Sequence, residues 1–127
     1  INNAIYGMTG GQMAPTTMPG QRATTSPTGR NTAETGMPIR MANILGELVT
    51  PGYVTRQAVL KPAQVNKTKK AIKKAFQYQL ENKCFSFVEV VSTCPTNWGM
   101  TPVDALKWAE DTLLPYYELG DYKVPEE

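Results

Sequence analysis

The first residues of the sequence combine groups that suit a hard cation and a phosphate. Asn2 and Asn3 follow an apolar residue, and Gly7, Gly10 and Gly11 come soon after them. An amide oxygen and a nearby backbone carbonyl are suitable Mg²⁺ ligands, and glycines let backbone N–H groups approach a phosphate closely. The same residues also fit an asparagine-rich turn whose side chains bind only local backbone. Both interpretations stay open at this stage.

A second candidate is Cys94, which follows an apolar segment and precedes a proline. A lone cysteine is most often a small buried hydrophobe, and an iron–sulfur cluster needs several cysteines. Cys84 is the other cysteine of the sequence. It lies at the opposite end of the same expected strand, about 30 Å away at about 3.3 Å per residue. We therefore expect no shared cluster and no disulfide, any further ligands of Cys94 outside this sequence, and a structural role for Cys84.

Composition narrows the chemistry. Histidine is absent, which removes the commonest general base and metal ligand, so catalysis would use carboxylates, backbone groups, amides or a bound cofactor. A net charge of +2 gives no reason to expect a nucleic acid or an anionic membrane as partner. No apolar run approaches the length of a membrane-spanning helix. Residues 61–83 carry a net +6 and residues 84–127 a net −6, so these parts face each other or different partners.

The elements that position these groups follow from hydrophobic periodicity and from turn residues. Residues 6–38 show no period, and we expect an ordered loop over a ligand or a partner subunit. The expected helices span residues 39–49, 62–82 and 101–115, the last with Thr101 as N-cap, and the expected strands span 53–59 and 85–91. The tail from residue 116 is expected to be extended over a surface.

The helices are expected to bury apolar residues at helical spacing. These are Ile39, Ala42, Leu45 and Leu48 or Val49 in the first helix, Val65, Ile72, Phe76 and Leu80 in the second, and Leu106, Ala109 and Leu113 in the third. The lysines of the second helix would then form a solvated outer face, and Trp98 and Trp108 would pack in the core or an interface. Glu89 lies inside an apolar strand, so it is either solvent-facing or paired.

Alternation of strand and helix predicts an α/β fold with a parallel sheet, flanking helices and right-handed connections. Ligands of such sheets bind at the carboxyl ends of the strands. The loop after Ile1 and the loop that starts at Cys94 both follow strands. We therefore expect both loops to open on one functional edge of the sheet.

Four segments together resemble the beta subunit of 2-oxoacid:ferredoxin oxidoreductases. They are INNAIYGMTGGQ at 1–12, TTSP at 24–27, FSFVEVVSTCPTNWGM at 85–100 and TPVDALKW at 101–108. The resemblance covers essentially the whole sequence, and it is strongest to the 2-oxoglutarate and 2-oxoisovalerate types. The sequence begins within a candidate site, so we interpret it as the C-terminal portion of a thiamin diphosphate-binding domain. Its expected parts are a cofactor loop (1–38), an α/β part (39–115) and a tail (116–127).

The resemblance also implies site residues. Asn3 would supply an amide oxygen and Ile5 a backbone carbonyl to Mg²⁺, and Gly7, Met8 and Thr9 would line the thiamin diphosphate. Cys94 matches the last ligand of a [4Fe-4S] cluster. The aspartate ligand and the other three cysteines of the family belong to a region outside this sequence, so all three cofactors are expected only in the complete subunit. No catalytic side chain is assigned.

The implied function is oxidative decarboxylation of a 2-oxoacid to acyl-CoA and CO₂, with electrons passed to ferredoxin. The cofactor supplies the electron sink, and the protein supplies positioning and electrostatics. The implied partners are the alpha subunit, ferredoxin, coenzyme A and the 2-oxoacid, in the cytoplasm, and an exposed sheet edge would favour self-association into a homo-oligomer. We expect the fragment alone to be inactive. The alternative is a non-catalytic α/β interaction module that docks on a partner subunit through its long loop and acidic tail.

Overall fold

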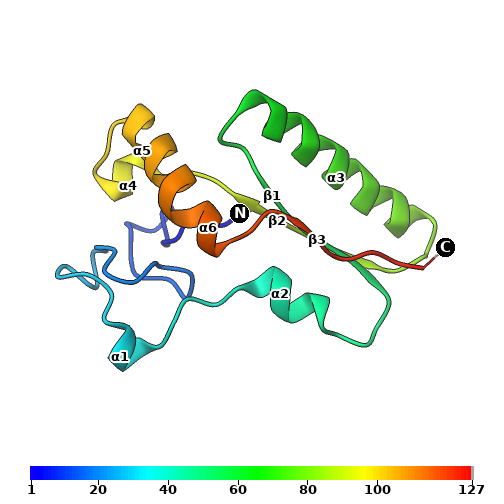
Figure 1. Ribbon diagram of the computed structural model, residues 1–127, viewed down its shortest axis with the longest axis horizontal. Coiled ribbons are helices and arrows are strands. Elements are labelled where there is room, and N and C mark those ends of the chain that lie inside the picture. The colour runs from blue at the N-terminus through cyan, green and yellow to red at the C-terminus, as the bar shows by residue number, and fades with distance from the viewer. Residues whose placement is uncertain (127) are drawn as a thin grey trace.

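The structure is a computed structural model, and it describes residues 1–126. Three strands form one sheet in the order β2-β1-β3. β1 (Gly52–Ala58) and β2 (Phe85–Val91) are parallel, and β3 (Gly120–Lys123) is antiparallel to β1. The helix α3 (Pro62–Leu80) connects β1 to β2 and covers one face of the sheet, and α2 (Met41–Gly46) lies at the other face (Figure 1). The result is an α/β fold in three layers.

The third strand corrects the expectation of a purely parallel sheet and of a tail that only crosses a surface. β3 pairs with the outer side of β1, and Thr55 Oγ1 donates a hydrogen bond to Gly120 O at 3.1 Å. β3 has only four residues, two of them the charged Asp121 and Lys123, so its sequence shows no apolar alternation. An edge strand pairs on one side only and needs little burial, so it can form without that pattern. Residue 127, the end of the expected tail, lies outside the described residues.

The other predicted elements are found close to their expected bounds. β1, α3 and β2 match the expected segments, and α2 is shorter than residues 39–49. The last predicted helix is divided into α5 (Pro102–Trp108), a π-helical turn η1 (Ala109–Leu113) and α6 (Leu114–Tyr116). Thr101 Oγ1 accepts from the Asp104 N–H at 3.2 Å, which confirms the predicted N-cap. The wider turn comes directly before Pro115, whose missing N–H interrupts the regular helical bonding.

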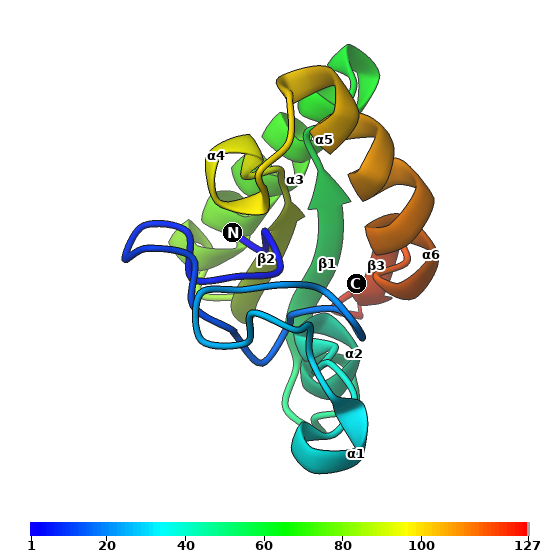
Figure 2. The ribbon, with the colours of Figure 1, turned by 90° about the vertical axis from the view of Figure 1, so that its left-hand side faces the viewer.

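Two short helices lie in segments that were expected to be loops. α1 (Thr32–Thr35) is a single turn within residues 6–38, and α4 (Pro95–Trp98) follows Cys94. The long N-terminal loop is held from within by Arg30, which is buried and donates to the carbonyl oxygens of Pro15 (3.0 Å) and Thr17 (2.7 Å). The loop is ordered, as expected, and lies beside α4 to α6 beyond the carboxyl ends of β1 and β2 (Figure 2).

The core lies at this same end of the sheet. It joins the N-terminal loop, the ends of β1 and β2, and the helices after β2; its buried members are Ala4, Met18, Ala58, Leu60, Val91, Ala109, Leu113 and Tyr117. Trp98 packs edge-on against Trp108, with ring centroids 4.7 Å apart. The two tryptophans therefore pack against the core, as expected. The N-terminal loop and the segment after β2 thus rest on this core.

Several helix faces differ from the predicted ones. On α3 the residues in contact with the sheet are small, with Thr68 and Ala71 buried, whereas Phe76 and Leu80 are 67% and 82% exposed. Val65 and Ile72 are also exposed, as are Ile39, Leu48 and Val49 near α2 and Leu106 on α5; Ala105 is buried instead. The apolar stripe of α3 is turned by roughly 110° from its buried face, at about 100° per residue. Small residues allow the helix to lie close to the strands, and the stripe is left beside the outer edge of β2.

Within residues 1–126, no helix combines the length and the apolar character needed to cross a membrane.

Candidate functional site

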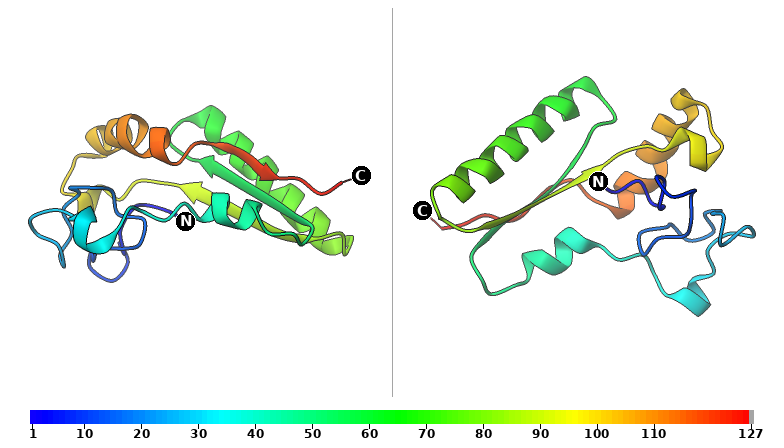
Figure 3. Two further views of the ribbon diagram at one scale, coloured as in Figure 1. Left: turned by 60° about the horizontal axis from the view of Figure 1, so that its bottom comes forward. Right: turned by 180° about the vertical axis from the view of Figure 1, so that it is seen from behind.

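A cleft of about 730 Å³ opens between the start of the chain and α4. Its lining comprises Ile1, Asn3, Ile5, Tyr6, Gly7, Met8, Thr9, Cys94, Thr96 and Asn97. All six residues predicted as cofactor or metal ligands are among them, although they come from two segments far apart in the sequence. As the topology rule predicts, the two loops lie together beyond the carboxyl end of β2 (Figure 3).

Gly7 is a point of close approach between the two loops. A Cβ atom at this position would lie 3.0 Å from Cys94 Sγ and 3.1 Å from Asn3 Nδ2. Asn97 Nδ2 donates to Gly7 O at 2.7 Å and lies 3.7 Å from Cys94 Sγ. Asn97 therefore joins the glycine loop to the cysteine loop. No motif or periodic pattern in the sequence indicates this role, although Asn97 lies only three residues after Cys94.

The two adjacent asparagines point in different directions. Asn2 is buried, and its Oδ1 accepts from the N–H of Ala4 at 3.0 Å. Ala4 has a left-handed backbone with φ of 61°, a conformation uncommon for a residue with a side chain. Asn3 lines the cleft, and its carbonyl accepts from Trp98 Nε1 at 3.0 Å. Among the described residues, none donates a hydrogen bond to Asn3 Oδ1, so this amide oxygen is available to a ligand in the cleft.

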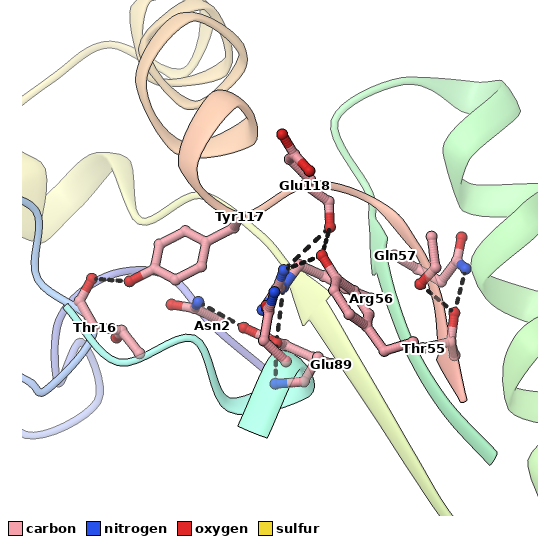
Figure 4. Close-up of polar contacts among 12 residues, drawn as sticks. Asn2, Thr16, Thr55, Arg56, Gln57, Glu89, Tyr117 and Glu118 are labelled. Carbon is pink, nitrogen blue, oxygen red and sulfur yellow. Dashed lines mark hydrogen bonds and ion pairs between the residues drawn. The ribbon is translucent and has the colours of Figure 1, made fainter. Parts of the chain in front are cut away.

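Asn2 connects the cleft loop to a buried ionic network. Its Nδ2 donates to Glu89 Oε1 at 2.9 Å, and Glu89 Oε2 lies 2.8 Å from Arg56 Nε (Figure 4). The guanidinium of Arg56 also donates to Glu118 O (3.1 Å) and to Asn43 Oδ1 (3.0 Å). Glu89 is therefore paired rather than solvent-facing. Arg56, inside β1, was missed because its partner is identified only once the strand register is known.

Tyr117, which directly follows α6, supports the same loop. It is fully buried, and its Oη donates to Thr16 O at 2.6 Å (Figure 4). Burial, with smaller contributions from Tyr116 and Glu89, raises the pKa of Tyr117 well above its usual value. Thr17 Oγ1 donates to Ala4 O at 2.6 Å. The backbone around Ala4 is thus held from both sides, so the positions of Asn3 and Ile5 are fixed by buried contacts.

The outer part of the cleft is different. Met8 is fully exposed, and Thr9 is exposed with its Oγ1 donating to Gln12 Oε1 at 2.7 Å. The lining includes no acidic or basic side chain. The cleft therefore offers amide, carbonyl, hydroxyl and thiol groups, a donor set that suits a hard cation through oxygen and a softer metal through sulfur.

Each cysteine is a free thiol and half-buried. Cys94 lines the cleft, whereas Cys84 precedes β2 at the opposite end of the strand. No group of three or more histidine, cysteine, aspartate or glutamate residues is placed to hold a metal ion within residues 1–126. A complete cluster would therefore need ligands from elsewhere.

Comparison with curated proteins gives clear relatives. The chain is 44% identical to ketoisovalerate oxidoreductase subunit VorA of Methanothermobacter thermautotrophicus over 97 residues, which are 76% of this chain and 20% of that protein. It is 42% identical to 2-oxoglutarate synthase subunit KorB of Methanocaldococcus jannaschii over 99% of this chain and 44% of that protein. The chain is homologous to subunits of 2-oxoacid:ferredoxin oxidoreductases.

KorB of Archaeoglobus fulgidus is a further such homologue, 41% identical over 84% of this chain. The chain spans less than half the length of each of these oxidoreductase subunits. No family model matches the chain, and no solved structure matches it. Homology therefore supports the resemblance that the four sequence segments carry, and the subunit names indicate a complex of several subunits.

Proposed function

We propose that this chain is the C-terminal portion of the thiamin diphosphate-binding subunit of a 2-oxoacid:ferredoxin oxidoreductase. The observation that carries the proposal is the cleft, because residues of two distant segments meet there and include all six expected ligands. The homology of the chain to KorB of Methanocaldococcus jannaschii extends over nearly all of its residues. The proposed reaction of the complete enzyme converts a 2-oxoacid to acyl-CoA and CO₂, and electrons pass to ferredoxin.

The cleft residues fit a magnesium–diphosphate group in part. Asn3 and Ile5 both line the cleft, and Asn3 Oδ1 accepts no hydrogen bond from the described residues; the Asn3 amide oxygen and the Ile5 carbonyl are proposed as Mg²⁺ ligands. A Cβ at Gly7 would lie 3.0 Å from Cys94 Sγ, so a glycine there lets the two loops that line the cleft lie close together. Thiamin diphosphate, when bound, supplies an electron sink for loss of CO₂. The chain's own residues would bind and orient it, with the remaining metal ligands supplied by the rest of the subunit.

Cys94 is proposed as one ligand of a [4Fe-4S] cluster. Its sulfur lies beside Gly7 and Asn97, where the two loops meet. This position would place a cluster next to the cofactor loop, where it would supply one-electron transfer. Asn97 would orient the thiolate through its weak N–H contact. The other three ligands would come from residues outside this sequence.

The substrate is proposed only as a 2-oxoacid. Relatives named for ketoisovalerate and for 2-oxoglutarate match the chain at nearly equal identity, 44% and 42%. The cleft lining carries no charged side chain that would select the second carboxylate of one of them. Selection of the substrate would therefore depend on the alpha subunit and on the remainder of this subunit.

The decisive experiment compares the two cysteines in the intact subunit. Cys94→Ser is expected to lower the iron content and the visible absorption of the purified protein, whereas Cys84→Ser leaves both unchanged. Asn3→Ala is expected to weaken Mg²⁺-dependent binding of thiamin diphosphate, measured by calorimetry, with the iron content retained. Equal effects of the two cysteine variants, or unaltered binding in Asn3→Ala, would contradict the proposed site.

The alternative, a non-catalytic module that docks on a partner, makes a different prediction. If it is right, Cys94→Ser and Asn3→Ala change neither the iron content nor the binding of thiamin diphosphate in the intact protein. The 127-residue chain alone is expected to bind thiamin diphosphate weakly or not at all and to reduce no ferredoxin, because it holds only part of each ligand set. Tight Mg²⁺-dependent binding by this chain alone would show that the half-site interpretation is wrong.

A further inference from the structure

The charge separation along the sequence persists in the folded molecule. Residues 61–83 carry a net +6 and residues 84–127 a net −6. Within residues 1–126, one ion pair joins these two parts, that of Lys61 with Glu110. Most of the positive charge of α3 therefore has no acidic partner in the described part of the chain, and it can attract another molecule.

A groove runs along α3 on the side that faces β3. It consists of three adjoining hollows of about 500, 230 and 300 Å³. The first two share Lys70 and Lys74 in their linings, and the last two share Gln57, Lys67 and Asp121. Because α3 packs over β1 and β2, whereas β3 is the edge strand beyond β1, the space between the helix and this edge is left open.

The helix side of this groove is positively charged. Its lining includes Lys67, Lys70, Lys73 and Lys74, and the first three of these are exposed. The Lys74 ammonium lies 5.0 Å from the centre of the Tyr53 ring, a cation–π contact that holds it in place. Lys67 and Lys74 are about 10 Å apart along the helix, at about 1.5 Å per residue. The charges thus form a row.

A row of charges favours an acidic polypeptide over other anions. A single phosphate could contact only part of a row about 10 Å long. Asp121 lines the middle of the groove and Glu81 one end, and both would repel the continuous charge of a nucleic acid. An extended polypeptide places a side chain on one face every 6.6 Å or so, close to the spacing of the lysines. Carboxylates on alternate residues therefore match the row.

We propose that this groove binds an extended acidic segment of another polypeptide, with carboxylates on alternate residues beside Lys67, Lys70 and Lys74. Of the acidic residues in 84–126, only Asp121 lines the groove, so the described part of this chain does not supply the segment. Leu119 is 39% exposed and lines the end away from Glu81, where the segment is expected to carry an apolar residue. The inference uses no residue of the cleft and does not depend on the proposed function.

Carbodiimide cross-linking identifies the occupant. The reagent joins a lysine amine to a carboxylate in direct contact with it. In the intact protein isolated together with its partner subunits, mass spectrometry is expected to find Lys67 or Lys70 joined to an aspartate or glutamate of a different polypeptide. Lys69 is exposed on the same helix but does not line the groove, so it is the internal control. Cross-links confined to acids of the same polypeptide, or none at Lys67 and Lys70, would overturn the proposal.

Charge-matched variants test the groove itself. The probe is a fluorescent peptide of alternating glutamate and threonine, and its control has glutamine in place of each glutamate. Fluorescence anisotropy at low ionic strength measures binding to the intact subunit separated from its partners. The double variant Lys67→Gln and Lys70→Gln is expected to weaken binding of the glutamate peptide about tenfold. Lys69→Gln with Lys107→Gln removes the same charge outside the groove and is expected to weaken it less than about twofold.

The outcomes separate the groove from general attraction. Equal losses in the two double variants, or equal binding of the two peptides, would overturn the proposal. So would displacement of the peptide by inorganic phosphate at constant ionic strength, since it would identify a small anion as the ligand. All four lysines are exposed, so the thermal midpoint is expected to stay unaltered in both variants. No readout involves a cofactor, so the outcome is separate from that of the proposed function.

Discussion

Arg56 and Glu89 form a buried ion pair between the two parallel strands. They are direct partners in the register of β1 and β2, and Arg56 Nε lies 2.8 Å from Glu89 Oε2 with the Arg56 side chain fully buried. The other oxygen of Glu89 accepts from Asn2, whose neighbour Asn3 lines the cleft. The ion pair therefore stabilises the sheet and also fixes the segment that presents the candidate ligands.

Removing the carboxylate of Glu89 is expected to destabilise the protein strongly. In Glu89→Gln the guanidinium of Arg56 keeps its charge in a buried site without a counter-ion, which costs about 3–5 kcal/mol. Asn2 faces an altered acceptor as well, so the segment around Ala4 loosens. Urea denaturation followed by far-ultraviolet circular dichroism measures the free energy of unfolding.

An exposed ion pair supplies the control for this variant. Lys61 and Glu110 pair at the surface with about half of each side chain exposed, and such pairs contribute about 0–1 kcal/mol. Glu110→Gln is accordingly expected to change the free energy of unfolding by less than about 1 kcal/mol. A loss in Glu89→Gln no larger than that in Glu110→Gln would show that the buried pair does not stabilise the fold.

Tyr117 is expected to make stability depend on alkaline pH. Burial raises its pKa above the ordinary 10.0, so the folded state holds the phenolic proton more tightly than the unfolded state. This contribution is complete below pH 10.0 and is lost as pH rises through the folded-state pKa. Denaturation from about pH 8 to about pH 11 is expected to show a decline that Tyr117→Phe reduces.

Two further features of the Tyr117 experiment make it specific. Tyr117→Phe leaves Thr16 O without its donor, so the variant is expected to be less stable at neutral pH by about 1–3 kcal/mol. Tyr6→Phe is the matched control, because Tyr6 is half-exposed at the cleft. This variant is expected to change neither the free energy of unfolding nor its dependence on pH. An alkaline decline of equal steepness in wild type and Tyr117→Phe would assign it to other groups.

The elements that the sequence predicts well are those whose signal is local. β2 is a run of apolar residues, and α3 combines a proline start with lysines at helical spacing, so length and periodicity identify both. The topology rule then places the Asn3 loop and the Cys94 loop at one edge without any knowledge of side-chain contacts. These two steps are sufficient to predict where the cleft lies.

The features that the sequence does not predict depend on distant partners. β3 forms because β1 offers a free edge, and nothing within its four residues indicates that pairing. The stripe with Phe76 predicts an amphipathic α3 but the wrong buried face, because the residues that contact the sheet are the small Thr68 and Ala71. Arg56 and Asn97 are polar residues whose roles follow from register and loop packing, and neither has a periodic signal.

Gly11 is expected to be required for the shape of the cleft loop. Its φ is +81°, and a Cβ there would lie 3.1–3.2 Å from the Asn97 side chain. Gly11→Ala therefore incurs backbone strain of about 1–2 kcal/mol and about 1–3 kcal/mol more from crowding. Displacing Asn97 also removes the donor to Gly7 O, so the emission of neighbouring Trp98 is expected to shift as the loop loosens.

Gly99 provides the comparison for Gly11, because it has a φ of +67° with no atom within 4 Å of an added Cβ. Gly99→Ala is expected to show the backbone strain alone, about 1–2 kcal/mol, with smaller loss of stability than Gly11→Ala and no change at Gly7. Thermal unfolding ranks the two variants, and accessibility of Cys94 to a thiol reagent reports on the loop. Equal losses in both variants, with unaltered Cys94 accessibility, would show that contact with Asn97 does not shape the cleft.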